Sequence, residues 1–476
     1  MSMPRAALLI DFGSTYTKLR AVDLDGPRLL GSGQGPSTVA SDITIGLKAA
    51  LGDLERRLGG LPNFQYRFAS SSAAGGLRMI TVGLVRELTA EAARQAALGA
   101  GAKLIASFAY QLTSSDINRI TELAPDIVLL AGGTDGGNTD VICTNAAVLA
   151  RATINCPIIV AGNRAATDQI CSLLTEANKP ISVTENVMPE FGVLNIEPAR
   201  EAIRQVFINR IVHAKGIDRA QNMFDRVLMP TPAAVLEGAR LLADGYGAMR
   251  GLGSLLVIDV GGATTDVHSV CTGKPTHEGV VLQGLPEPYL KRTVEGDLGM
   301  RHNALAILEA AGVDLVAADS AVPVERLEQL VRRLHTDVER LPTDAEERAL
   351  DRALSRAAVR IAVRRHAGTT ETVYTVTGPV IVQRGKDLSN IAAVVGTGGP
   401  LAHGVDPAAT LAMALADAAE PLSLRPRQAK LLLDRDYVLY ACGLLASVEP
   451  QAALALALRY IQPLQETPRR GQGSVS

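Results

Sequence analysis

Cysteine is scarce and widely scattered in this chain. Its five cysteines, at positions 143, 156, 171, 271 and 442, form no C-x-x-C pair and leave an odd count. A disulfide framework uses paired cysteines, and zinc or iron–sulfur sites use closely spaced ones, so the pattern excludes both. The seven histidines show no metal-ligand spacing either. We therefore expect reduced cysteines and a cytoplasmic protein.

Long hydrophobic runs are also missing. No apolar run reaches the ~20 residues that a membrane span needs. The apolar stretch Ala6–Ile10 is too short for the core of a signal peptide. The formal net charge of −2 gives no overall bias toward nucleic acid or anionic lipid. The sequence thus predicts neither a membrane nor a nucleic-acid partner.

The chain does contain enough residues for several cores. It has 476 residues, of which 47% are hydrophobic, and this length is typical of about three domains. We expect an α/β protein with a first lobe at residues 1–120, an inserted unit at 121–225 and a second lobe at 226–466. Residues 467–476 are polar and are predicted to be a disordered tail.

The inserted unit is predicted from alternating patterns. Short apolar runs that are typical of buried strands alternate with longer segments of helical spacing. The strand-like runs are 126–131, 157–161 and 181–187, and the helical segments are 145–151, 165–177 and 198–212. This βαβαβα order predicts a parallel α/β unit.

One pattern occurs twice, about half a chain apart. Residues 8–18 read LLIDFGSTYTK and residues 256–267 read LVIDVGGATTDV. Each copy has an apolar strand, an aspartate, one apolar residue, a glycine turn and a resumed strand with hydroxyl residues. We call them the first and second phosphate hairpins. The repeat predicts two related lobes that face one ligand.

The residue types in these hairpins fit phosphate chemistry. Asp11 and Asp259 are predicted to hold Mg²⁺ through water, because Mg²⁺ favours carboxylates, waters and phosphate oxygens. Glycines allow a tight turn, and backbone N–H groups, hydroxyls and a lysine bind phosphate oxygens. The predicted ligands are Gly13, Ser14, Thr15, Thr17 and Lys18 in the first hairpin and Gly261, Gly262, Thr264 and Thr265 in the second.

A third motif follows both hairpins. Residues 394–401 read VVGTGGPL, a strand that runs into a glycine turn. Such a turn allows the backbone to pack flat against a nucleoside. The predicted contacts are Gly396, Thr397, Gly398 and Gly399. We call this segment the adenosine motif.

The three motifs, in this order, resemble those of the actin, sugar-kinase and heat-shock-chaperone superfamily. Residues 231–246 and 436–446 resemble its two connecting helices. The resemblance implies an α/β fold of two ribonuclease-H-like, actin-type ATPase lobes around a nucleotide cleft, with ATP and Mg²⁺ as ligands. It also implies a hinge that closes on the nucleotide.

The sequence departs from the chaperones at one position. In those proteins a glutamate before the first connecting helix helps to position the attacking water, whereas Met229 occupies the matching position here. This departure predicts ATP binding with slow hydrolysis. Asp11, Asp259 and Asp266 are the candidate catalytic residues.

Three longer segments narrow the resemblance. Residues 10–18, 129–138 and 293–301 together resemble the glutamate mutase accessory proteins called MutL or GlmL, over most of the chain. Those proteins are encoded with adenosylcobalamin-dependent aminomutases. The resemblance therefore implies a chaperone-like reactivating factor whose partners are the subunits of a cobalamin-dependent mutase such as glutamate (methylaspartate) mutase.

Other functions stay open at this point. A small-molecule kinase of the same superfamily would use an aspartate to activate an acceptor hydroxyl. A filament-forming actin homologue would sediment with ATP in a concentration-dependent way, and a homodimer is another open assembly. An iron–sulfur activator is disfavoured because the cysteines are not clustered.

A second site is one interpretation of residues 129–138. Open α/β sheets bind ligands at the carboxyl ends of their parallel strands, where Gly132, Gly133, Asp135 and Asn138 are predicted to lie. The alternative is a glycine-rich turn that Asp135 or Asn138 caps. Glu295 and Asp297 follow the second hairpin and either polarise water or Mg²⁺ or are solvated loop acids.

Overall fold

The computed structural model describes residues 5–13, 16–38, 42–72, 78–214, 223–376 and 378–464. Contacts divide the chain into two compact units. The first consists of residues 1–251, 282–292 and 439–457, and the second of residues 252–281, 293–438 and 458–476. The predicted tail at 467–476 lies outside the described residues. Within the described residues, no helix combines the length and the hydropathy needed to cross a bilayer.

A five-stranded sheet carries the first phosphate hairpin. Its order is β10 (Arg226–Pro230), β4 (Phe64–Ser71), β1 (Ala6–Phe12), β2 (Tyr16–Asp23) and β3 (Arg28–Pro36). Strand β2 is antiparallel to β1 and β3, whereas β4 is parallel to β1 and β10. All seven residues of β1 are buried. This strand order is that of a ribonuclease-H-like lobe.

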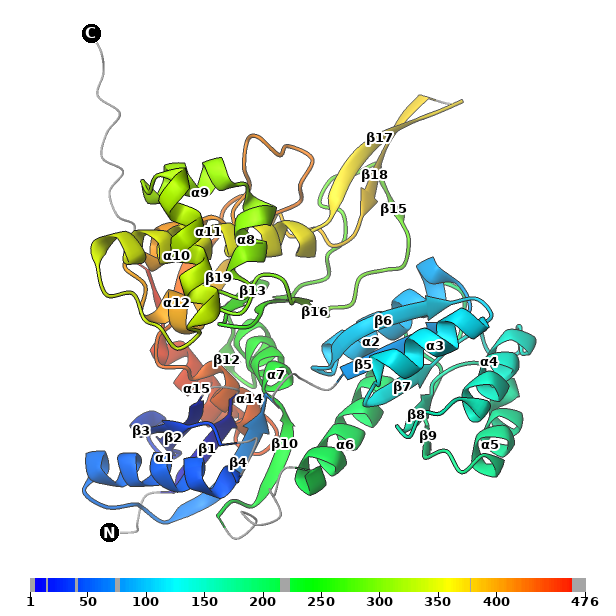
Figure 1. The fold of residues 1–476 in the computed structure, drawn as a ribbon, viewed down its shortest axis with the longest axis horizontal. Helices are drawn as coiled ribbons and strands as arrows, with labels where there is room; N and C mark the ends of the chain where they lie inside the picture. The colour runs from blue at the N-terminus through cyan, green and yellow to red at the C-terminus, as the bar shows by residue number, and fades with distance from the viewer. Residues whose placement is uncertain are drawn as a thin grey trace. The chain divides into compact units, whose positions relative to one another are not determined.

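Helix α1 (Ile43–Leu58) packs on this sheet (Figure 1). Asp42 caps its first turn by accepting a hydrogen bond from the backbone N–H of Thr44 at 2.9 Å. Glycines of β3 allow α1 to approach the strand closely, because a Cβ on Gly33 would lie 2.3 Å from the carbonyl oxygen of Ala50 in α1.

Two helices of the first unit cross at a pair of glycines. They are α7 (Thr231–Asp244) and α14 (Leu439–Leu445), the segments that resemble connecting helices. A Cβ on Gly443 would lie 1.8 Å from the carbonyl oxygen of Ala234, and one on Gly238 would lie 2.2 Å from that of Leu439. Larger residues at either position would separate the helices. Helix α15 (Pro450–Tyr460) follows α14.

A parallel sheet forms the inserted part of the first unit. Its order is β6 (Lys103–Ala109), β5 (Arg78–Gly83), β7 (Ile127–Leu130), β8 (Ile158–Val160) and β9 (Ile181–Val183). Every neighbouring pair is parallel. Strands β5 and β6 precede residue 121, so this sheet draws on residues before the expected start of the inserted unit. Its helices are α2 (Glu91–Gly99), α3 (Ser114–Leu123), α4 (Asp140–Arg151), α5 (Thr167–Glu176) and α6 (Glu197–Ala214), with short turns at Arg86–Ala90 and Arg164–Ala166.

A six-stranded sheet carries the second phosphate hairpin. Its order is β16 (Leu290–Glu295), β14 (Thr265–Val270), β13 (Leu255–Val260), β19 (Ala393–Thr397), β20 (Lys430–Asp434) and β21 (Ile461–Pro463). A hairpin of β13 and β14 is followed on the other side by parallel β19 and β20. The second unit therefore repeats the central strand order of the first, which confirms the predicted pair of related lobes.

The helices of the second unit are α8 (Ala304–Ala311), α9 (Val313–Ser320), α10 (Val324–Thr336), α11 (Ala345–His366), α12 (Gly399–Ala402) and α13 (Pro407–Ala412). A smaller sheet contains β15 (Val280–Gln283), β18 (Gly378–Arg384) and β17 (Thr369–Thr375), and a two-stranded ribbon contains β11 (Gly245–Tyr246) and β12 (Met249–Arg250). Apolar side chains of α8, α10 and α11 share one buried cluster with β13 and β14.

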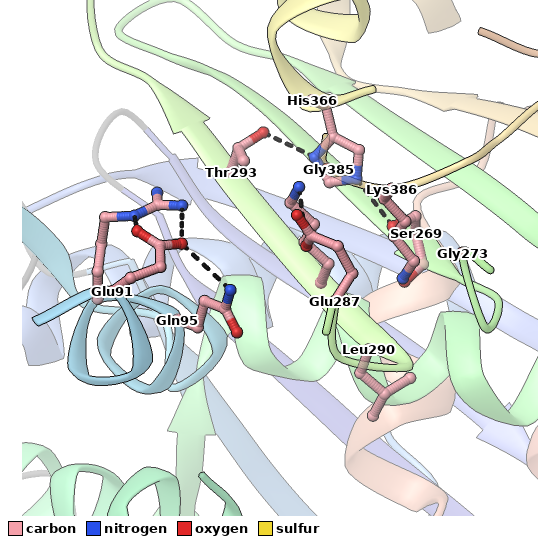
Figure 2. A network of polar contacts seen from close by, with 12 residues as sticks. Glu91, Gln95, Ser269, Gly273, Glu287, Leu290, Thr293, His366, Gly385 and Lys386 are labelled. Atoms are coloured by element: carbon pink, nitrogen blue, oxygen red, sulfur yellow. Dashed lines mark hydrogen bonds and ion pairs between the residues drawn. The ribbon is translucent and has the colours of Figure 1, made fainter. Parts of the chain in front are cut away.

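A buried histidine fastens α11 to the second sheet. His366 is fully buried, and its Nδ1 and Nε2 lie 2.8 Å from the hydroxyls of Thr293 and Ser269, respectively (Figure 2). The ammonium group of Lys386, also buried, donates to the backbone oxygen of Ser269 at 3.4 Å. These contacts fix the end of α11 beside β14 and β16.

Candidate functional site

The first phosphate hairpin joins β1 and β2 through a tight turn. The backbone N–H of Gly13 donates to the carbonyl oxygen of Tyr16 at 3.0 Å, and a Cβ on Gly13 would lie 2.6 Å from that oxygen. Asp11 lies opposite Lys18 across the two strands. Ser14 and Thr15, predicted phosphate ligands, lie outside the described residues.

Asp11 is buried at the end of β1. Its Oδ1 accepts a hydrogen bond from the hydroxyl of Thr231 at 2.6 Å and a longer one from that of Ser70 at 3.4 Å. Burial raises the pKa of Asp11, and the nearby charge of Lys18 acts in the opposite direction. Thr231 is the first residue of α7, so the carboxylate is attached directly to a connecting helix.

Thr17 lies opposite Phe12, so its side chain is on the other face of the sheet from the carboxylate of Asp11. It lies on β2, fully buried, and its Oγ1 has no hydrogen-bond partner among the residues that the structure describes. A Cβ on Gly46 of α1 would lie 3.3 Å from this hydroxyl oxygen, so the structure does not bring this predicted phosphate ligand beside Asp11.

The second phosphate hairpin joins β13 and β14. Asp259 lies opposite Asp266, and the hydroxyl of Thr264 donates to Oδ2 of Asp266 at 2.9 Å. The hydroxyl of Thr265 donates to the carbonyl oxygen of Leu298 at 2.7 Å, which makes Thr265 a structural contact. Asp259 and Asp266, two candidate catalytic residues, are therefore paired across neighbouring strands.

In the turn of this hairpin, three successive carbonyl oxygens point toward residues 300–303. The carbonyl oxygens of Gly261 and Gly262 accept from the backbone N–H groups of Met300 and Arg301 at 3.1 and 2.9 Å. That of Ala263 accepts from the side-chain amide of Asn303 at 3.0 Å. In a trans peptide the C=O of one residue and the N–H of the next point in opposite directions. The N–H groups of residues 262–264 therefore point away from this segment, an arrangement that favours an anion.

Arg301 holds the supporting segment in place. Its guanidinium donates to both carboxylate oxygens of Asp351 on α11, at 2.6 and 3.1 Å, and to the carbonyl oxygen of Arg340 at 3.2 Å. A bidentate pair of this kind fixes orientation as well as charge. Arg301 belongs to the segment 293–301 of the family resemblance, but its role depends on a partner 50 residues away and is not evident from that segment.

The adenosine motif lies directly against the second hairpin. Strand β19 is parallel to β13, with Thr397 opposite Asp259. Gly398 has a φ of +96°, and a Cβ there would lie 2.2 Å from the carbonyl oxygen of Val260 and 2.8 Å from Oδ1 of Asp259. The hydroxyl of Thr397 donates to the carboxylate of Asp434 at 3.4 Å. The structure thus brings together two of the three motifs within the second unit.

The remaining members of these motifs have different surroundings. Gly396 is buried on β19, where a Cβ would lie 3.2 Å from Leu401. Gly399 begins α12, and a Cβ there would have its nearest neighbour at 3.9 Å. Asp434, which the sequence analysis does not single out, accepts from the backbone N–H of Val438 at 2.8 Å.

Glu295 and Asp297 share one guanidinium. Arg365 donates to Glu295 at 2.7 Å and to the two oxygens of Asp297 at 2.8 and 2.9 Å. Burial raises the pKa of Glu295, whereas the hydrogen bond from Arg365 lowers the pKa of Asp297. Arg365 precedes His366, so the same end of α11 positions both acids.

The glycine loop (residues 131–138) follows β7 in the parallel sheet. Asp135 Oδ1 accepts from the backbone N–H of Arg164 and from the side-chain amide of Asn186, both at 2.9 Å. Asn138 Oδ1 accepts from the backbone N–H of Val141 at 3.1 Å, at the start of α4. Gly132 and Gly133 have φ values of +147° and +72°. Asn138 caps the start of α4, as the interpretation of a capped glycine turn expects. The loop also lies at the carboxyl end of a parallel strand, as the interpretation of a ligand site expects.

Two buried asparagines outside this loop hold its backbone. Asn163 accepts from the backbone N–H of Gly136 at 3.0 Å and donates to the carbonyl oxygens of Gly137 and Asn138. Asn186 donates to the carbonyl oxygen of Gly133 at 3.0 Å. Each asparagine follows a strand of the parallel sheet. A polar residue just after a predicted strand is the sequence signal that could have identified them.

The repeated lobe topology and the strand–aspartate–glycine hairpins define an α/β protein of the actin and sugar-kinase type. Comparison with known proteins then identifies the family. The MutL protein family model matches residues 7–461. Protein MutL of Clostridium tetanomorphum is 45% identical over 460 residues, which are 96% of this chain and 99% of that protein. The chain therefore belongs to the MutL protein family, as the sequence resemblance predicts.

Solved structures give more distant similarities. Nucleotide-free acetone carboxylase has a TM-score of 0.39 at 14% identity, with 93% of this chain and 70% of that chain covered. Xylulose kinase from Bifidobacterium adolescentis has a TM-score of 0.32 at 12% identity, with 97% and 95% covered. A glycerol dehydratase reactivase has a TM-score of 0.33 at 11% identity, with 93% and 99% covered.

Proposed function

We propose that this chain binds Mg-ATP, hydrolyses it slowly and acts as a cytoplasmic accessory or reactivating protein for an adenosylcobalamin-dependent aminomutase such as glutamate mutase. Membership of the MutL family supports an accessory role. The backbone of the second phosphate hairpin carries the nucleotide part of the proposal, because its three carbonyl oxygens face residues 300–303. The opposed N–H groups are then available to phosphate oxygens.

Each unit supplies a hairpin to the proposed nucleotide site. The sequence repeat supports one ATP that both hairpins bind, with the adenosine motif at the nucleoside. Asp11 and Asp259 would hold Mg²⁺ through water, and the ion would neutralise phosphate charge when bound. One carboxylate per hairpin fits an ion that keeps several waters and uses phosphate oxygens.

The surroundings of Asp11 support the proposal of slow hydrolysis. Met229 lies on β10 opposite Ser70 of β4, and a thioether neither accepts a proton from water nor orients it strongly. The carboxylate of Asp11 is an alternative group to orient water, but its Oδ1 already accepts a hydrogen bond from Thr231. We infer that ATP acts mainly by selecting between two states of the protein that bind the mutase differently.

An activity-recovery assay tests this proposal. Cobalamin-inactivated glutamate mutase is incubated with fresh coenzyme, ATP and the wild-type chain, an Asp259→Asn variant or a control variant at exposed Glu176. Recovery should require ATP and occur with wild type and Glu176→Gln but not with Asp259→Asn. Lack of ATP-dependent recovery with any chain would contradict reactivation of this enzyme. ATP consumption only on addition of a small acceptor would instead favour the kinase alternative.

A further inference from the structure

The parallel sheet of the first unit has a strand order that defines a second candidate site. From β5 the chain passes to β6 on one side and then to β7 on the other, and continues outward to β8 and β9. The connections therefore diverge between β5 and β7. In open parallel sheets such a point leaves a crevice at the carboxyl ends of the two strands, where ligands bind.

The loops that follow these two strands are in contact. A Cβ on Gly132 would lie 3.5 Å from both the Cβ and the backbone nitrogen of Leu84. Leu84 directly follows β5, and Gly132 belongs to the glycine loop after β7. The two walls of the expected crevice thus adjoin at this glycine.

The backbone of the glycine loop points two donors away from the residues that follow β8 and β9. The carbonyl oxygens of Gly132 and Gly133 accept from the backbone N–H of Asn163 and the side-chain amide of Asn186, both at 3.0 Å. These asparagines follow β8 and β9, on the side of β7 away from β5. The N–H groups of Gly133 and Thr134 must point the opposite way, because both peptides are trans.

These two donors are available to a ligand. Across the described ranges, no residue accepts a hydrogen bond from the backbone N–H of Gly133 or Thr134. The geometry is fixed, because Gly133 has a φ of +72° and a Cβ there would lie 2.3 Å from the carbonyl oxygen of Asn138. Successive outward N–H groups in a glycine turn favour an anionic group.

The opposite wall supplies a cation and apolar surface. Arg86 is exposed in the turn Arg86–Ala90 after β5, and Leu84, Val85 and Leu88 are partly buried there. The hydroxyl of Thr89 accepts from the backbone N–H groups of Leu84 and Val85 at 2.7 and 3.1 Å, so this wall is ordered by its own contacts.

Three acids belong to the same loops. The Oδ1 of Asp135 accepts from Arg164 and Asn186, on the side of β8 and β9. Glu87 and Asp140 are exposed to water, which screens their charges.

We propose that this crevice binds the phosphate group of a small molecule, through the N–H groups of Gly133 and Thr134 and the guanidinium of Arg86. The site differs from the phosphate hairpins in residues and in sheet. It gives the inserted part of the first unit a ligand of its own.

The test uses the full chain saturated with Mg²⁺ and a non-hydrolysable ATP analogue, so that the hairpins are occupied. Inorganic phosphate is titrated while amide hydrogen exchange is measured. Phosphate should slow exchange at residues 133–134, and Arg86→Ala should weaken this protection by about tenfold, the loss of a charge-assisted contact. Arg164→Ala is the matched control, since Arg164 is exposed after β8, and should change the affinity less than about twofold.

The outcomes separate this proposal from the ATP proposal. Protection at residues 133–134 should persist in Asp259→Asn without the ATP analogue, even if ATP binding fails. No protection, or equal weakening by Arg86→Ala and Arg164→Ala, would overturn the phosphate site. Equal protection by acetate would assign the donors to a carboxylate instead and would overturn the choice of phosphate.

Discussion

The two phosphate hairpins have closely similar sequences but different supports. The carboxylate of Asp11 is buried under Thr231 and Ser70, from a connecting helix and a neighbouring strand. Asp259 instead lies beside Asp266 and the backbone of Gly398, and residues 300–303 hold its turn. The first hairpin is thus tied to an element that resembles a hinge, and the second to the adenosine motif. Two copies of one motif can therefore have different roles, because different neighbouring elements contact each copy.

The largest expected effect concerns the second hairpin. Gly398→Ala places a methyl group 2.2 Å from the carbonyl oxygen of Val260 and forces an L residue to φ +96°. We expect a loss of about 3 kcal/mol in the free energy of unfolding and loss of ATP binding. Denaturant unfolding and calorimetry check both. Gly399→Ala is the control, because its nearest neighbour would be 3.9 Å away, and an equal loss there would contradict this explanation.

A smaller effect is expected at the first hairpin. Thr231→Val removes the 2.6 Å hydrogen bond to Asp11 and leaves a buried carboxylate oxygen with a weaker donor. The free energy of unfolding should fall by about 1–3 kcal/mol. Ser70→Ala removes only the 3.4 Å contact and should cost less. Urea titration of both variants measures the difference, and the reverse ranking would argue against Thr231 as the main support.

The smallest expected effect is a difference between the two units in how their stability depends on pH. Glu347 of the second unit accepts hydrogen bonds from Thr343 and Arg340, which lower its pKa to about 2 from the ordinary 4.5. Its stabilisation is present above pH 4.5 and is lost as the pH falls toward 2. Burial raises the pKa of Asp11, so Asp11 contributes the opposite sign and favours folding at lower pH.

Thermal melts at pH 6 and pH 3 measure this difference. Wild type should lose more stability between the two pH values than Glu347→Gln, whose amide does not titrate. An identical loss in both proteins would show that Glu347 does not contribute. Asp11→Asn should steepen the acid loss, because it removes a carboxyl group whose raised pKa favours folding when it is protonated.

Short-range patterns in the sequence were sufficient for the hairpins. Leu255–Val260 is predicted as a strand with the bounds that the structure gives β13, because an uninterrupted apolar run ends at a glycine turn. The same logic succeeds for β1, because the apolar run Ala6–Phe12 also ends at a glycine. Residues 42–58 have helical spacing, and the structure has α1 at Ile43–Leu58 with Asp42 as its N-terminal cap.

Long-range contacts account for what the sequence did not predict. Strand β6 is partly exposed and lacks a clear period, and neither it nor β5 was predicted although both belong to the parallel sheet. Asn186 and Asp434 form hydrogen bonds with residues more than 30 positions away, and no local sequence pattern predicts such partners. The clamp by Arg365 on Glu295 and Asp297 depends likewise on a distant helix.

Calorimetric titration with Mg-ATP tests most directly whether both hairpins bind the same nucleotide. The wild-type chain should bind one ATP, and either Asp11→Asn or Asp259→Asn alone should weaken that binding by at least about tenfold, because each removes one charged contact. Unchanged affinity in both variants, or two independent sites of which each variant removes one, would contradict the account.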